Sequence, residues 1–98
     1  MESKASPVAT ATDLLGGARI LAQAVGVTPS MVSQWSVGHR PVAADKCVLI
    51  ERATEGRVTV EGLRSDLTWS RIADPTWPHP AGRPVIDVAR PVAVQEVV

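Results

Sequence analysis

The sequence predicts a small all-α fold, a bundle of four to five short helices followed by an extended, proline-rich C-terminal tail. Three observations predict this class. Glycines and N-cap residues followed by proline divide the first two thirds of the chain into short helical segments. Aromatic residues make up only 3% of the 98 residues, so the core depends on Val, Leu, Ile and Ala. Five of the eight prolines lie in the last 25 residues, a spacing through which no helix continues.

The first two helices are defined by their end signals. The first follows the N-cap Ser6 and a proline in its first turn, and it stops at the glycine pair 16–17. The second spans about residues 18–24 and stops at Gly26. Its buried face is expected to comprise Ile20, Leu21 and either Ala24 or Val25.

Three more helices follow. Thr28 and the proline after it start the third, which ends near Gly38. The fourth covers about residues 43–54 and stops at a glycine, and Thr59 then caps a brief fifth helix through Leu63. The apolar face of the fourth helix is expected to comprise Cys47, Ile50 and either Ala53 or Thr54.

The tail shows a different pattern. Four apolar residues fall on one parity, a weak period-two pattern that a proline interrupts: Ile86, Val88, Val92 and Val94. The pattern fits an edge strand, an arm packed on a partner, or disorder. Trp69 and Trp77 are expected to cover the small core or to anchor this tail. The predicted organisation is therefore an N-terminal extension (1–6), a helical domain (7–72) and a Pro/Val-rich tail (73–98) that is a candidate dimerisation arm.

Charge is unevenly distributed. Ten basic and ten acidic residues give a formal net charge of zero, which at first argues against binding a polyanion. Residues 14–64 contain six Lys or Arg and four Asp or Glu, a net charge of +2, whereas residues 1–13 and 65–98 each carry −1. The predicted helical domain is thus mildly basic between acidic ends.

Residues 18–35 carry the spacing of two helices that cross through a short turn. Such a crossing needs a small residue where the backbones nearly touch, which Ala22 provides, and a residue tolerant of positive φ in the turn, which Gly26 provides. The second helix buries an apolar face against the first, and Val32 and Trp35 lie one turn apart on that face. These four residues are expected to be structural.

With Leu21, Val25 and Val27 also apolar at the expected places, this segment resembles the DNA-binding helix-turn-helix. The loop at residues 38–42 and the helix around residues 46–54 are similar to those of the Cro/C1-type family, in particular its YdaS-like or Cro-like phage regulators. The resemblance covers about residues 8–72. It implies a cytoplasmic transcriptional regulator whose third helix enters the major groove, and which represses as a homodimer by occluding an operator in double-stranded DNA.

The resemblance assigns DNA contacts to residues outside the buried face of the third helix. Gln34 is the foremost candidate for base readout, because its amide can bind adenine bidentately. The full set expected to contact bases is Gln34, Ser33, Ser30, Thr28 and Pro29. Val37 also faces outward, and the absence of arginine on this face disfavours strong guanine readout. The set expected to contact phosphates is Arg19, His39, Arg40 and Lys46.

The sequence also allows other interpretations of these residues. A helix-turn-helix can serve protein contacts alone, so a protein-interaction or antitoxin-like module, whose tail binds a partner, is the second interpretation. Arg40 could instead hydrogen-bond a helix C-terminus, and His39 could be an ordinary loop histidine. Arginines 52, 57 and 64 are expected to be solvated or ion-paired.

Enzyme chemistry is not expected. Cys47 lies on an apolar helical face, which is typical of a small hydrophobic residue rather than a nucleophile. The two histidines and the single cysteine show no metal-ligand spacing, so neither a metal nor another cofactor is predicted. The N-terminus precedes no continuous apolar run, and no stretch is long and apolar enough for a membrane span.

Overall fold

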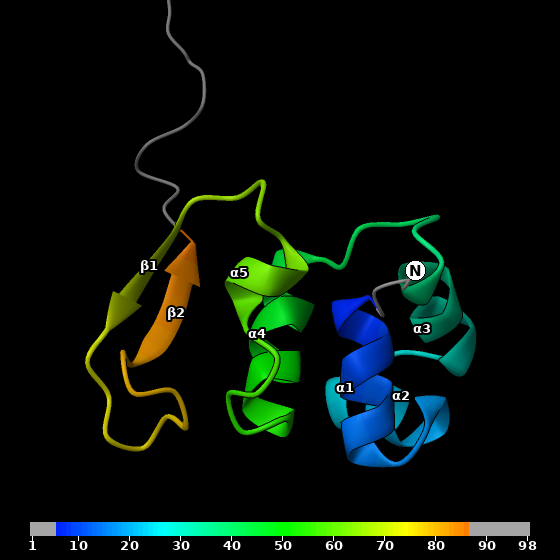
Figure 1. Cartoon of the computed structure of the whole chain (residues 1–98), viewed down its shortest axis with the longest axis horizontal. Coiled ribbons are helices and arrows are strands. Elements are labelled where there is room, and N and C mark those ends of the chain that lie inside the picture. The colour runs from blue at the N-terminus through cyan, green and yellow to red at the C-terminus, as the bar shows by residue number, and fades with distance from the viewer. Residues whose placement is uncertain (1–5, 87–98) are drawn as a thin grey trace, which may run out of the picture.

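The computed structural model describes residues 6–86, which form five helices and a two-stranded sheet (Figure 1). The elements in chain order are α1 (Pro7–Leu15), α2 (Ala18–Val25), α3 (Pro29–Ser36), α4 (Ala44–Ala53), α5 (Val60–Leu63), β1 (Trp69–Ile72) and β2 (Arg83–Ile86). The small helical domain agrees with the predicted bundle. The predicted all-α class is wrong in one respect, because an antiparallel β-hairpin follows the helices.

Side-chain caps start three of the helices, as predicted. The hydroxyl of Ser6 accepts a hydrogen bond from the backbone N–H of Ala9 at 3.0 Å. Thr28 and Thr59 cap α3 and α5 in the same way, each accepting from the backbone N–H three residues ahead at 3.2 Å. Each hydroxyl satisfies one of the backbone donors that have no partner within the helix.

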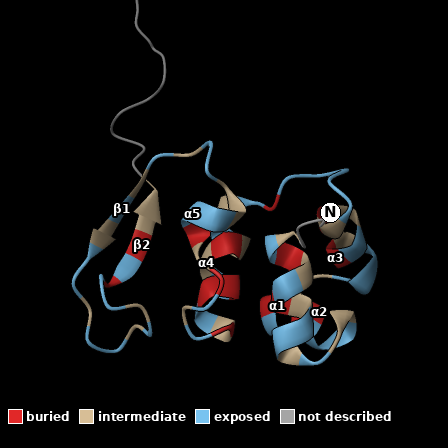
Figure 2. Ribbon diagram, viewed as in Figure 1, coloured by how far each residue is buried: buried red, intermediate tan, exposed pale blue. Residues whose placement is uncertain are grey.

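The core lies where α1, α2 and α4 meet and extends to α3 and α5 (Figure 2). Its buried apolar residues are Val8, Ala11, Leu21, Ala22, Val25, Val32, Trp35, Val42, Cys47, Ile50, Val58 and Val60. The expectation that Ile20 is buried is wrong, since 45% of its surface is exposed. The rotation of α2 is set by Leu21 and Val25, which lie one turn apart and face the core, so Ile20 falls at the edge of that face.

The hairpin lies at the opposite end of the molecule from α3 (Figure 1). β1 and β2 pair antiparallel, with Trp69 opposite Ile86 and Ile72 opposite Arg83. The predicted boundary between residues 72 and 73 falls between the two paired strands of this hairpin. Residues 1–5 and 87–98 lie outside the described residues, so the predicted dimerisation arm is described only as far as residue 86.

A buried carboxylate joins this hairpin to the helices. Glu51 of α4 is fully buried and accepts hydrogen bonds from both terminal nitrogens of Arg71, at 2.6 and 2.7 Å. It also accepts from Trp77 Nε1 at 2.6 Å and from the backbone N–H of Val60 at 3.0 Å. Burial disfavours the charged carboxylate, but these donors outweigh burial and hold the pKa of Glu51 below its ordinary value. The carboxylate is therefore ionised and fully partnered at neutral pH.

Replacing Arg71 with methionine is expected to lower the free energy of unfolding by about 3 kcal/mol, because the Glu51 charge stays buried without its principal partner. Arg83→Met is the matched control, since that arginine lies on the same hairpin with a 46% exposed side chain and only a 3.7 Å ion pair to Asp74. The control should change stability by no more than about 0.5 kcal/mol. Urea unfolding followed by tryptophan fluorescence measures both, and equal losses in the two variants would contradict the role given to Arg71.

Candidate nucleic-acid interface

The turn between α2 and α3 is tight because Gly26 adopts a left-handed conformation, with φ of 76°. Its backbone N–H and that of Val27 both bond to the carbonyl of Ala22, the latter at 3.0 Å. A Cβ at this glycine would lie 3.9 Å from Lys46 Nζ, an ordinary contact, so the backbone conformation rather than space favours glycine. Ala22 itself is buried at the crossing of the helices.

Two buried side chains set the rotation of α3. Val32 and Trp35 face the core, with 1% and 6% of their surfaces exposed. The residues on the other side of α3 are consequently turned to solvent: Thr28, Pro29, Ser30, Ser33 and Val37 are exposed, and Gln34 is half-buried. The structure therefore brings the five residues expected to contact bases onto one surface, which we call the α3 face.

Within residues 6–86, the side chains of Ser30, Ser33 and Gln34 make no hydrogen bond to another part of the chain. The hydroxyl of Thr28 differs, because it accepts from the backbone N–H of Met31 as the helix cap. Its own proton remains able to reach an external acceptor. The α3 face thus presents polar groups whose hydrogen-bonding capacity the rest of the described structure leaves unused.

The four residues expected to contact phosphates lie in three parts of the fold. Arg19 is exposed in the first turn of α2. His39 and Arg40 are exposed in the loop after α3, where their backbone N–H groups bond to the carbonyl of Gln34 at 2.9 and 3.4 Å. Lys46 in α4 lies beside the turn between α2 and α3. The loop is therefore folded back on the end of α3. None of these four residues belongs to α3 itself.

Arg40 and Lys46 share a groove of about 390 Å³ with Arg64. The apolar lining comes from Val27, Met31, Trp35, Pro41 and Ala43. Arg64 donates to the Val42 carbonyl at 2.9 Å and forms two bonds to the Asp66 carboxylate, at 2.8 and 2.7 Å, in line with the expectation that it is ion-paired. The sequence held no signal that Arg64 lies near Lys46, because 17 intervening residues separate them along the chain.

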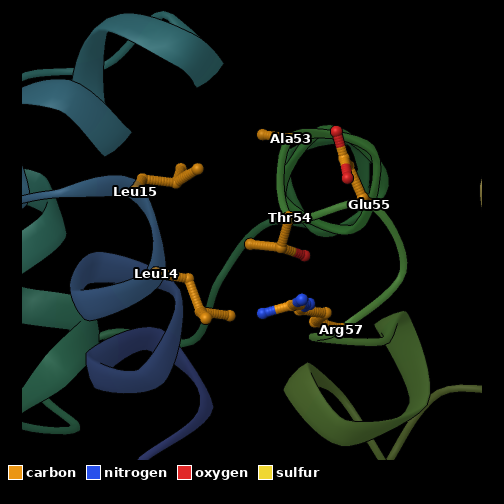
Figure 3. A pocket seen from close by; sticks show the side chains of 6 residues that line it. All are labelled: Leu14, Leu15, Ala53, Thr54, Glu55 and Arg57. Atoms are coloured by element: carbon orange, nitrogen blue, oxygen red, sulfur yellow. The ribbon is translucent and has the colours of Figure 1, made fainter.

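A second hollow, of about 240 Å³, lies between the C-terminal ends of α1 and α4 (Figure 3). The side chains of Leu14 and Leu15 face those of Thr54 and Arg57 across it, and the remaining lining residues are Ala53 and Glu55. No lining residue comes from α2 or α3, so this hollow is separate from the α3 face. It pairs no nucleophile with a general base and does not indicate catalysis.

Cys47 is completely buried, and burial raises its pKa to about 11. The thiol is therefore protonated at neutral pH and is not a nucleophile, in agreement with its interpretation as a small core residue. In residues 6–86 no three side chains of His, Cys, Asp or Glu gather to hold a metal ion. The same part of the chain has no helix of a length and apolarity that would cross a membrane.

Known proteins resemble this chain both in sequence and in structure. A protein of Escherichia coli (strain K12) called "Putative transcriptional regulator YdaS" is 46% identical over 57 residues. That segment is 58% of this chain and 58% of the relative, so the match spans less than two thirds of the relative's length. The solved structure of the Cro protein from the "putative prophage element Xfaso 1" of Xylella fastidiosa strain Ann-1 is 38% identical, with a TM-score of 0.58. The structural match covers 62% of this chain and 92% of that Cro protein.

The family comparison covers the helices and the first strand of the hairpin. The profile described as "Bacterial toxin YdaS" matches residues 8–72, which include α1 to α5 and the first strand of the hairpin. The matched segment is more than half of the chain and contains the α2–α3 pair and the four residues expected to contact phosphates. The chain belongs to the YdaS family.

Proposed function

We propose that this chain is a sequence-specific DNA-binding transcriptional regulator of the Cro-like type, and that it acts as a homodimer by occluding an operator. One observation carries the proposal: the α3 face presents an amide and hydroxyls without intramolecular partners in the described structure. Exposed arginines also lie in the preceding helix and in the loop that follows α3. An exposed helix of this kind fits the major groove, where amides and hydroxyls meet base edges and flanking cations meet phosphates. Similarity to a Cro protein and to a transcriptional regulator supports it.

In this proposal Gln34 reads a base, and Ser33, Ser30, Thr28 and Pro29 complete the contact surface. Gln34 is the residue with the most specific chemistry, since its amide can donate to and accept from one adenine at the same time. The phosphate contacts come from the four residues outside α3, namely Arg19, His39, Arg40 and Lys46. These positions fix the register of α3 in the groove, and they carry no sequence information themselves.

The proposed homodimer follows from the small size of the reading surface. One short helix reads only a few base pairs, and two copies related by a twofold axis would read two half-sites about 34 Å apart, one turn of B-DNA. Occupancy would then exclude polymerase from the overlapping promoter. The mechanism requires no bond to be made or broken, and so neither a cofactor nor a catalytic residue.

A protein-interaction function is the second candidate, because the family is described as a bacterial toxin. In that case the helix pair or the residues beyond the hairpin would bind another protein, as an antitoxin-like or toxin-like module does. The two candidates differ in one measurable property. A regulator has a preferred duplex sequence, whereas an interaction module of this kind has none.

Selection from random duplex DNA at a stated salt concentration tests the proposal. We expect a twofold-symmetric consensus whose half-sites are centred about 10 base pairs apart, because each subunit places α3 in successive major grooves. Sequencing of the bound pool after several rounds measures the consensus. An unenriched pool would reject the regulator and favour the interaction module, and a single asymmetric site would reject the homodimer.

Gln34→Ala is expected to lower the preference for the selected operator over a scrambled duplex by about thirtyfold or more, since it removes a bidentate amide worth at least about 1 kcal/mol from each of two subunits. The variant should fold normally because Gln34 makes no side-chain hydrogen bond within residues 6–86. Gln23→Ala, which removes an exposed amide from α2, is the control and should keep the full preference. Binding titrations measure the ratio, and an unchanged ratio for Gln34→Ala would remove this residue from base readout.

Arg40→Ala is expected to weaken binding to operator and unrelated duplex alike and to reduce the slope of log affinity against log salt by about 0.9 for each phosphate that the variant no longer neutralises. Arg57→Ala is the matched control, because Arg57 lines the hollow between α1 and α4, to which α2 and α3 contribute no residue. Titrations at four or more salt concentrations measure the slopes. If Arg40→Ala and the wild type have the same slope, Arg40 holds the loop rather than the DNA.

A further inference from the structure

Val37 is the most exposed large hydrophobic residue of the described chain. It exposes 67% of its surface, whereas Leu14, Ile20, Leu49 and Ile72 expose between 36% and 45%. Single exposed apolar residues are common and need no explanation by themselves. This valine differs from the other four in its position, because it stands on the surface that the proposed function assigns to base readout.

The backbone keeps Val37 on the α3 face. It is the C-cap residue of α3, with φ of −92° and ψ of 0°, and its N–H bonds to the carbonyl of Ser33 at 3.1 Å. This bond continues the helical pattern by one residue, so Val37 lies one turn beyond Ser33 and Gln34 on the same side. The two branched methyl groups therefore extend the surface formed by the hydroxyls and the amide.

The α3 face lacks the charged side chains that read guanine and cytosine most specifically. No residue from Ile20 to Gly38 is charged. Bidentate recognition of guanine uses Arg or Lys, and recognition of the cytosine amino group uses Asp or Glu. The hydroxyls of Ser30 and Ser33 can contact any base and discriminate little. The contacts that remain to distinguish one base from another are an amide on adenine and an apolar group on the C5 methyl of thymine. The face contains one residue suited to each, Gln34 and Val37.

The surroundings of Val37 favour a base edge over the sugar-phosphate backbone. The valine lines a shallow hollow of about 220 Å³ together with Ser33, Ser36 and, from α1, Asp13. A carboxylate beside the hollow repels a phosphate, but it does not repel a neutral methyl group. An apolar side chain also gains nothing from a phosphate, whereas a thymine methyl removes its surface from water.

We propose that Val37 is a specificity-determining residue that contacts the C5 methyl of a thymine, so that A·T pairs lie opposite α3 in each operator half-site. This inference rests on the proposed function. Three residues of helix rise by about 4.5 Å, and base pairs are stacked at about 3.4 Å, so the adenine of Gln34 and the thymine of Val37 lie one or two base pairs apart.

Deoxyuridine tests this contact, because it pairs like thymidine but lacks the C5 methyl. Starting from the selected operator, each thymine is replaced in turn in both half-sites, and affinity is measured for the wild type and Val37→Ala. At one thymine position, the substitution should lower the affinity of the wild type about fourfold when made in one half-site and about fifteenfold when made in both. Val37→Ala should lose the same amount of affinity on the unsubstituted selected operator. Its affinity should not change further when deoxyuridine is placed at that position.

Two controls keep the experiment specific. Ile72→Ala removes an exposed apolar side chain from the hairpin and should retain the full response to deoxyuridine. Urea unfolding of Val37→Ala should match the wild type, because this side chain is mostly exposed. The inference would be overturned if Val37→Ala responded to deoxyuridine as the wild type does at every position. A selected half-site without thymine opposite α3 would also overturn it. Either result would leave the proposed regulator intact. Failure to select any operator would instead reject the proposed function itself.

Discussion

The buried carboxylate of Glu51 is the interaction on which the C-terminal half of the fold depends. A buried charge is tolerated only when partners match it, and here the partners come from three places distant in sequence. They are Arg71 in β1, Trp77 in the hairpin turn and the backbone of Val60 at the start of α5. Because one carboxylate needs all of them, α5, β1 and the turn are fixed on α4 together. That arrangement keeps the hairpin at the end of the molecule away from α3, and the α3 face is left open.

The helices could be predicted from the sequence because their ends are local. Ser6, Thr28 and Thr59 each cap a backbone N–H only three residues away. The hairpin could not be predicted from the sequence, because its register joins residues as far apart as Trp69 and Ile86. Its prolines also indicated an irregular tail, yet Pro84 lies within β2. A two-stranded sheet has only edge strands, in which the missing N–H of proline is tolerated.

The candidate interface could likewise be predicted from the sequence only in part. Its outward surface followed from the sequence because Val32 and Trp35 fix the rotation of α3 by their periodicity alone. The misassignment of Ile20 shows the limit of that reasoning, since a short helix allows more than one apolar stripe and tertiary packing selects one. The approach of Arg64 to Lys46 depends on how the loop after α5 packs, which no local pattern encodes.

The zero net charge has a consequence for how such a surface would work. If Arg19, Arg40 and Lys46 are among the few phosphate contacts, then non-specific binding is weak and depends only shallowly on salt. A neutral α3 adds no long-range attraction, so its contribution is confined to the bases it touches. Discrimination per half-site is then modest, but free energies from two half-sites add and their affinity ratios multiply. For a domain this small, a second copy therefore contributes more to specificity than further cations would, because cations raise affinity for all sequences equally.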